Sequence, residues 1–132
     1  VEKSTELAIL DGDKVDVKLN VSPILLYPDQ AVPLSMLVAE ATTNAMKNIG
    51  AQDGKGGKIE VTLRQDNLAC HFVLKNTVSP VNEHEGTGLG SKLMNAFAMQ
   101  LGGQIATERT ADTYTLSLEF NALEFQPEQR DF

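Results

Sequence analysis

Residues 31–48 read AVPLSMLVAEATTNAMKN, and this stretch decides the fold class of the chain. Its apolar residues recur at steps of three and four, the spacing of one face of an α-helix. The pattern predicts a helix over residues 30–49 that packs one stripe against a core. We place Pro33 in its first turn, where a missing N–H leaves no hydrogen bond unmade. The stripe contains Leu34, Leu37, Val38, Ala41 and Ala45.

The same helix carries a carboxylate, an amide and an ammonium group beside its apolar stripe. Glu40, Asn44 and Lys47 lie within about 40° of one another at helical spacing. Asparagine is unfavourable inside a helix because its side chain competes for backbone hydrogen bonds, yet Asn44 has small neighbours that leave room for a ligand. A solvated helix flank is the alternative interpretation. Those neighbours are Ala41, Thr42, Thr43 and Ala45.

Period-two alternation on both sides of the helix predicts strands. Before it we expect a strand over 14–21, paired across the turn at 11–13 with a short strand around 7–10. After a glycine-rich loop at 50–57, strands are expected over 58–64 and 68–75, joined by a hairpin turn at 65–67. Two more strands, over 104–109 and 113–120, close the chain.

A second helix is expected over residues 91–101, after a turn-rich stretch at 76–90. Its Leu93, Phe97 and Leu101 lie four apart on one face, and Gly102-Gly103 terminates it. Strands before, between and after two helices indicate an α+β fold, a mixed and mostly antiparallel sheet with helices on one face. We assign residues 1–125 to a single domain and 126–132 to a C-terminal tail.

The composition excludes several classes of function. The 132 residues hold 11 Lys and Arg against 18 Asp and Glu, a formal charge of −7, which opposes contact with nucleic acid or an anionic membrane. A single cysteine, Cys70, rules out an intrachain disulfide, and its place in the alternation predicts a small buried side chain. No apolar run approaches the roughly 18 residues of a membrane span. The start at Val1, without Met, indicates an excised fragment.

A glycine run, Glu85-Gly86-Thr87-Gly88-Leu89-Gly90, stands immediately before the second helix. Alternate glycines let a backbone approach a ligand closely, and the free N–H groups of a helix start favour an anion such as phosphate. A flexible hinge is the alternative for this run taken alone. The acid-amide-lysine helix upstream sharpens the interpretation toward a phosphate site.

The two segments together resemble the GHKL ATPase superfamily, and within it the ATP-binding catalytic domain of HWE/HisKA_2-type sensor histidine kinases. Residues 31–48 look like the N box, with its E-x-x-x-N-A-x-K pattern. Residues 86–94, followed by Gln100-Leu101-Gly102-Gly103, look like the G2 box and the helix behind it. The resemblance covers residues 14–121 and implies a two-layer sandwich of Bergerat type that binds ATP and Mg²⁺.

Roles follow from this resemblance residue by residue. Asn44 would ligate Mg²⁺ through its side-chain oxygen, the donor type that this hard cation prefers. Glu40 would position the attacking group at the γ-phosphate, and Lys47 would pair with phosphate oxygens, so both are catalytic candidates. The remaining nucleotide-binding candidates are Asn48, Asn76, Gly86, Thr87, Gly88, Leu89, Gly90 and Thr113.

The resemblance also implies the reaction and the partners. The domain would bind Mg·ATP and donate the γ-phosphate to a histidine on a helical dimerisation domain before Val1, with a response regulator as an indirect partner. The location would be cytoplasmic. Neither His71, expected on the sheet surface, nor His84, expected as a solvated loop residue, lies on a helix of the phosphoacceptor kind, and Lys92 is expected to be solvated.

The chain departs from the family at its G1 box, D-x-G-x-G, where it has Asn76, Val78 and Pro80. Asn76 keeps a carbonyl acceptor for the adenine amino group but loses the charge. Asp112 stands where a glycine usually precedes the residue that Thr113 resembles, and the lid between Asn76 and Gly86 is short. Two alternatives therefore stay open: a degenerate module of a histidine phosphotransferase that docks a response regulator, and an anti-sigma-factor-type serine kinase.

Overall fold

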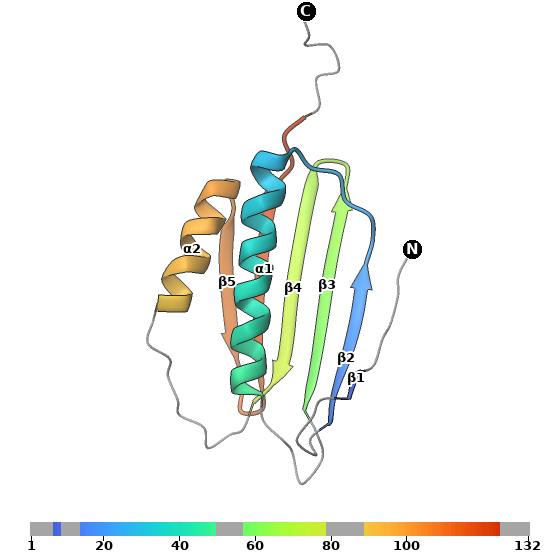
Figure 1. The fold of residues 1–132 in the computed structure, drawn as a ribbon, viewed down its shortest axis with the longest axis vertical. Coiled ribbons are helices and arrows are strands. Elements are labelled where there is room, and N and C mark those ends of the chain that lie inside the picture. Colours follow the sequence, from blue (N-terminus) through green and yellow to red (C-terminus); the bar gives the residue numbers. More distant parts are fainter. Residues whose placement is uncertain (1–6, 9–13, 50–56, 79–88, 125–132) are drawn as a thin grey trace, which may run out of the picture.

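The computed structural model describes residues 7–8, 14–49, 57–78 and 89–124 of the chain. These residues form a six-stranded sheet with two helices on one of its faces (Figure 1), which confirms the α+β prediction. The elements in chain order are β1 (Leu7–Ala8), β2 (Lys14–Val21), α1 (Pro28–Asn48), β3 (Lys58–Asp66), β4 (Ala69–Thr77), α2 (Leu89–Leu101), β5 (Gln104–Arg109) and β6 (Thr113–Asn121).

The strand order is β1-β2-β3-β4-β6-β5. The strands β2 and β3 pair in parallel, and α1 forms the crossover between them, as parallel neighbours require. The other described pairs are antiparallel. The predicted mixed, mostly antiparallel sheet is therefore present.

The core lies between the helices and the sheet. Alternate residues of β4 and β6 turn toward α1 and α2, so that Phe72 and Leu118 are almost fully buried, and Leu37 of α1 is buried against them. Burying a side chain of this size stabilises the fold by about 1.5–3 kcal/mol. Cys70 is part of this core, as its alternation predicts.

The helix α1 begins earlier than the sequence pattern predicts. Pro28 occupies its first turn, with Tyr27 as N-cap residue, while Pro33 lies inside the helix and is buried. The main-chain N–H groups of Gln30 and Ala31 both donate to the Tyr27 carbonyl at 2.9 Å, which closes the first turn. Our placement of Pro33 in the first turn was wrong, because either proline fits that position and only Pro28 follows an extended residue.

The helix α2 spans two residues more than predicted and buries a different face. Met94, Ala98 and Leu101 are buried, whereas Leu93 is 40% exposed and Phe97 is partly buried. The predicted stop is confirmed: Gly102 has a φ of 74°, and the N–H groups of Gly102 and Gly103 donate to the carbonyls of Met99 and Ala98, a Schellman motif.

The hairpin between β3 and β4 is tighter than predicted. Asp66 pairs with Ala69, so the turn consists of Asn67 and Leu68, and Asn67 adopts a φ of 61°, which asparagine tolerates. The strand β4 continues to Thr77, beyond the predicted end at 75. Asn76 therefore lies inside a strand and not in the turn-rich stretch where we expected it.

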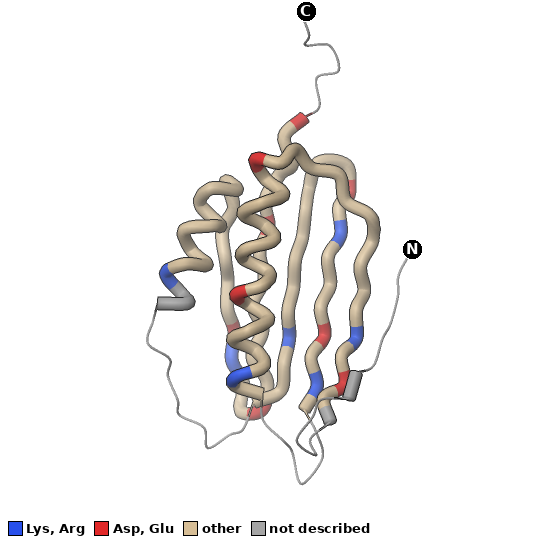
Figure 2. The backbone as a smooth tube through the Cα atoms, in the orientation of Figure 1, with Lys and Arg blue, Asp and Glu red and all other residues tan. Residues whose placement is uncertain are grey.

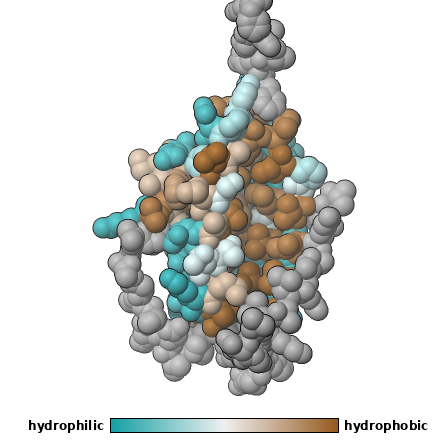
Figure 3. Space-filling view, viewed as in Figure 1, coloured by the Kyte–Doolittle hydropathy of each residue, from teal (hydrophilic) through white to brown (hydrophobic). Residues whose placement is uncertain are grey.

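The helices leave half of the sheet uncovered in the part of the chain that the structure describes. They stand over β4, β6 and β5, while the face of β2 and β3 on the same side carries partly buried apolar residues, among them Val17, Val61 and Leu63. Figure 3 shows the resulting apolar surface beside the helix layer. The strand expected at 7–10 is described only at Leu7–Ala8, and the turn at 11–13 and residues 50–56 lie outside the described residues.

Candidate functional site

The C-terminal half of α1 carries the polar residues that the sequence singled out. Glu40 and Asn44 are half-buried, and Lys47 is exposed in the last turn of the helix. Figure 2 shows how few charged positions α1 has, with a basic one toward its C-terminal end. The structure thus gives one helix flank a carboxylate, an amide and an ammonium group, with the first two partly shielded from water.

Asn48, one turn after Asn44, is committed to the helix itself. Its side-chain Nδ2 donates to the main-chain carbonyl of Asn44 at 2.9 Å. This hydrogen bond orients the amide group of Asn48 and leaves its side-chain oxygen to contact a ligand.

The end of β4 lies beside this half of α1. The two elements finish at the same end of the molecule (Figure 1). On the helix-facing side of the sheet, Asn76 is paired in register with Ile59 of β3 and Tyr114 of β6. Asn76 is 2% exposed, and Ile59 is buried as well. A polar side chain here is surrounded by apolar neighbours.

Only the donor group of the Asn76 side-chain amide has a hydrogen-bond partner among the described residues. Its Nδ2 donates to the main-chain carbonyl of Thr77 at 3.1 Å. Its Oδ1 is buried and has no hydrogen-bond partner among the described residues. A buried acceptor without a donor costs about 1–3 kcal/mol, and such groups are rare enough to need an explanation. A ligand that brings a donor to Oδ1 would supply one.

Gly57, immediately before β3, lies close to the side chain of Ile49. A side chain on Gly57 would place its Cβ 2.3 Å from Cγ1 of Ile49, the residue that follows α1, and 3.0 Å from Oγ1 of Thr77. The Thr77 hydroxyl in turn accepts from the N–H of Lys58 at 3.0 Å. This hydrogen bond joins the start of β3 to the end of β4, next to Asn76.

Thr113 is positioned differently from the other candidates. In β6 the buried residues are Leu116, Leu118 and Phe120, so the odd-numbered Thr113 lies on the sheet face that points away from the helices. Its hydroxyl is 2.8 Å from the hydroxyl of Thr110 within the β5–β6 turn. The residue of β6 that lies beside Asn76 on the helix face is Tyr114, which the sequence reasoning missed. The alternation of β6 counted back from Leu116 could have identified it.

The glycine run is only partly described. Gly86, Thr87 and Gly88 lie outside the described residues, as do Pro80 and His84, and Leu89 and Gly90 form the first turn of α2. Val78, at a position where a G1 glycine was expected, is buried at 3% exposure. Its N–H donates to the carbonyl of Asp112 at 3.0 Å. A bulky side chain here packs in the core and ties β4 to the β5–β6 turn.

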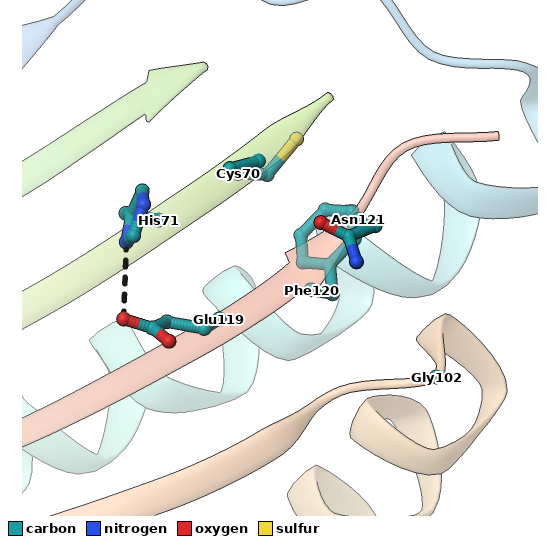
Figure 4. A pocket seen from close by; sticks show the side chains of 7 residues that line it. Cys70, His71, Gly102, Glu119, Phe120 and Asn121 are labelled. Atoms are coloured by element: carbon teal, nitrogen blue, oxygen red, sulfur yellow. Dashed lines mark ion pairs between the residues drawn. The ribbon is translucent and has the colours of Figure 1, made fainter. Parts of the chain in front are cut away.

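A hollow lies at the end of β4 opposite to Asn76. It encloses about 210 Å³ and is lined by Ala69, Cys70, His71, Gly102, Glu119, Phe120 and Asn121 (Figure 4). His71 Nδ1 lies 3.3 Å from Glu119 Oε2, but the two side chains are 43% and 74% exposed, so this pair contributes little. His71 is on the outer face of the sheet, as the sequence predicts. The described residues contain no group of three or more His, Cys, Asp or Glu side chains that could hold a metal ion.

The residues of α1 fit Mg²⁺ only in combination with a phosphate ligand. Asn44 offers one amide oxygen, and Mg²⁺ bound with nucleotide normally takes few protein ligands because waters and phosphate oxygens complete its octahedron. The orphaned acceptor of Asn76 fits a nucleobase, so both ends of a nucleotide find suitable groups at this end of the fold.

Comparison with solved structures places this fold among histidine kinase catalytic domains. The chain is similar to the Erythrobacter litoralis EL346 blue-light activated histidine kinase, with a TM-score of 0.66 and 16% identity over 82% of this chain and 35% of that one. The Acinetobacter baumannii histidine kinase AdeS gives a TM-score of 0.66 at 13% identity, over 87% and 58% of the two chains. The nucleotide-free catalytic domain of histidine kinase ThkA gives 0.63 at 18% identity, over 82% and 80%.

The chain has the fold of the ATPase-type catalytic domain found in histidine kinases. It spans about a third of the EL346 kinase and somewhat more than half of AdeS. No family model matches the sequence, and no curated protein does. Among the described helices, none combines the length and apolar character needed to cross a membrane.

Proposed function

We propose that this chain is the ATP-binding catalytic domain of a sensor histidine kinase of HWE/HisKA_2 type. The observation that carries the proposal is the unpartnered, buried Oδ1 of Asn76, which lies at the same end of the fold as the Glu40, Asn44 and Lys47 flank of α1. A kinase fold alone does not require a buried acceptor at this place. A nucleotide with its base at Asn76 and its phosphates along α1 accounts for both features.

Each residue then has a definite task. Asn44 contributes an amide oxygen to the Mg²⁺ that accompanies the nucleotide, and Lys47 neutralises phosphate charge in the last turn of α1. Glu40 holds the incoming nucleophile and accepts its proton. The glycine run 86–90 and the first turn of α2 supply N–H groups to the phosphates, and Asn48 adds its remaining amide oxygen. ATP supplies the transferable γ-phosphoryl group, and transfer depends mainly on positioning and on charge neutralisation.

The acceptor is a histidine on a separate helical dimerisation domain, and a response regulator receives the phosphoryl group afterwards. The half-buried Glu40 and Asn44 favour this function over a degenerate docking module, which needs no magnesium ligand. The anti-sigma-factor-type serine kinase shares the nucleotide site and differs only in the acceptor. We place the protein in the cytoplasm, where ATP and the regulator are available.

The test is a calorimetric titration of Asn44→Ala with ATP in the presence and absence of Mg²⁺. We expect the variant to lose the Mg²⁺ dependence of binding and to retain its melting temperature, because Asn44 lies at the edge of the buried stripe. The matched control is Asn95→Ala, an exposed helical asparagine of α2, which should behave as the wild type. Mg²⁺-dependent binding that survives unchanged in Asn44→Ala would contradict the proposal.

A further inference from the structure

The outward side of α1 is poor in charge for a helix at the surface. The helix packs against α2 and the sheet, and no described element covers its outward side (Figure 1). A surface helix normally places charged and polar residues there. The exposed residues of α1 between Asp29 and Lys47 are all uncharged, and the two largest, Val32 and Met36, are 60% and 50% exposed. The exposed residues between the two charges are Val32, Ser35, Met36, Ala39 and Thr43.

Four of these residues have the spacing of a helix–helix contact. They are Val32, Met36, Ala39 and Thr43, and we call them the outward seam. Steps of four, three and four keep them along one line of the helix, as in helices that pack side by side. The first two residues of the seam are large and the last two are small. An antiparallel helix with the same seam would therefore place Met36 opposite Ala39. It would also place Val32 opposite Thr43.

The charges at the two ends of the seam favour the same arrangement. Asp29 and Lys47 are both exposed and are 47 − 29 = 18 residues apart. Eighteen residues make about five full helical turns, so both side chains lie on one side of the helix. In an antiparallel pair of α1 helices, Asp29 of each copy lies beside Lys47 of the other copy. A parallel pair would bring like charges together. Charges at the rim of a contact determine its orientation more than its affinity.

We propose that the outward seam of α1 packs against the same seam of a second copy of this chain, in a symmetric antiparallel dimer. This inference does not depend on the proposed function. A twofold axis at the middle of α1 relates the two copies. The helix α2 lies beside α1 in the helix layer (Figure 1), so the same axis makes it face α2 of the other copy. There Met99 is 77% exposed.

The size of the helix layer predicts a weak dimer. The helices have 21 and 13 residues, and helices of these lengths present about 500 Å² per copy. Stable interfaces bury about 800 Å² per partner. We therefore expect a dissociation constant between about 10 µM and 1 mM.

Sedimentation equilibrium of the 132-residue chain without nucleotide tests the dimer, at about 0.15 M salt to screen the charge of −7 on each copy. We expect the average mass to rise from monomer toward dimer between about 10 µM and 1 mM. Met36→Lys should raise the dissociation constant at least about tenfold, because it buries a charge in the contact. Leu68→Lys is the matched control and should dimerise like the wild type, since Leu68 is 42% exposed in the β3–β4 turn, away from the helix layer. A chain that stays monomeric at about 1 mM would overturn the proposal.

Ala39→Met distinguishes a specific seam from unspecific apolar association. The substitution adds apolar surface at an exposed position, so unspecific association would become tighter. In the proposed dimer the new side chain meets Met36 of the other copy, and overpacking there should weaken dimerisation at least about fivefold. Tighter association of Ala39→Met would contradict the proposed contact.

Charge reversal tests the antiparallel orientation. Asp29→Lys and Lys47→Glu each replace two attractive pairs with two repulsive ones, and each should raise the dissociation constant about three- to thirtyfold. The double variant restores opposite charges at both ends and should return to within about twofold of the wild type. A double variant that dimerises as weakly as the single variants, with an unchanged melting temperature, would overturn the orientation.

Discussion

Replacing Asn76 with leucine should not destabilise the nucleotide-free protein. Leucine has the same number of side-chain heavy atoms as asparagine and fits the apolar surroundings, where position 76 is 2% exposed. The substitution removes an orphaned acceptor, a gain of about 1–3 kcal/mol, and also removes one net hydrogen bond to Thr77, a loss of about 0.5–1.5 kcal/mol. The free energy of unfolding should therefore stay the same or rise by up to about 2 kcal/mol.

The assay is thermal and urea unfolding followed by far-ultraviolet circular dichroism, without nucleotide. For a domain of 132 residues, an increase of this size corresponds to a rise in melting temperature of up to about 7 °C. Asn20→Leu is the control, because Asn20 lies on the outer face of the sheet and donates only at 3.5 Å to Glu60. Its stability should change by less than about 0.5 kcal/mol.

A decrease of more than about 1 kcal/mol in the free energy of unfolding of Asn76→Leu would refute the reasoning. Removing an acceptor that has no hydrogen-bond partner cannot cost that much. That result would mean that Oδ1 is hydrogen-bonded in solution, and the acceptor would no longer be available for a base. The same variant should bind ATP more weakly, so the stability of the free protein and its affinity for ATP are expected to move in opposite directions.

Three further predictions concern catalysis, the buried thiol and the isolated chain. Glu40→Gln should keep ATP affinity within about twofold and reduce phosphoryl transfer to the added dimerisation domain by about two to four orders of magnitude, measured with radiolabelled ATP; equal loss of binding would make Glu40 a binding residue only. Burial raises the pKa of the Cys70 thiol, against a smaller lowering by the backbone N–H of Ala122. The stability that the protonated thiol contributes is thus present below the ordinary thiol pKa and declines as the pH rises through the raised pKa. The wild type should therefore lose stability at alkaline pH more steeply than Cys70→Ala. Parallel profiles of stability against pH would contradict this. Residues 1–132 alone should show no autophosphorylation, since in-line transfer needs an acceptor at close range and His71 lies on the outer sheet face; acid-labile label lost in His84→Ala would overturn this.

The sequence predicted the elements well because their patterns depend on local geometry. Alternation along β2, β3, β4 and β6 and the three-four spacing of α1 are fixed by which side chains must be buried. The stop of α2 was predictable for the same kind of reason, since Gly102 can adopt the left-handed conformation that a helix end requires. Cys70 was placed in the core by alternation alone.

The errors arose where the sequence offered two equivalent choices. Pro28 and Pro33 both suit a first helical turn, and the structure places Pro28 there. On α2 both the Leu93 and the Met94 stripes are apolar, and the structure buries the Met94 stripe.

The sequence places the polar candidates of α1 on one flank of the helix, and their role in a site stays a prediction. Helical spacing puts Glu40, Asn44 and Lys47 on one flank. Thr113 was selected by residue type, although alternation along β6 places it on the sheet face away from the helices. Tyr114 carries no motif of its own. Alternation along β6 places it on the helix-facing side of the sheet, and the β4–β6 register shows that it lies opposite Asn76.

The most direct measurement of the central claim is a calorimetric titration of the 132-residue chain with ATP, with and without Mg²⁺. The resemblance implies a charged acceptor at the position of Asn76, and its loss would weaken binding by about one to two decades, so we expect saturable but weak binding that strengthens when Mg²⁺ is added. No heat at millimolar nucleotide in either condition would contradict the account and would favour a docking module that has kept the kinase fold.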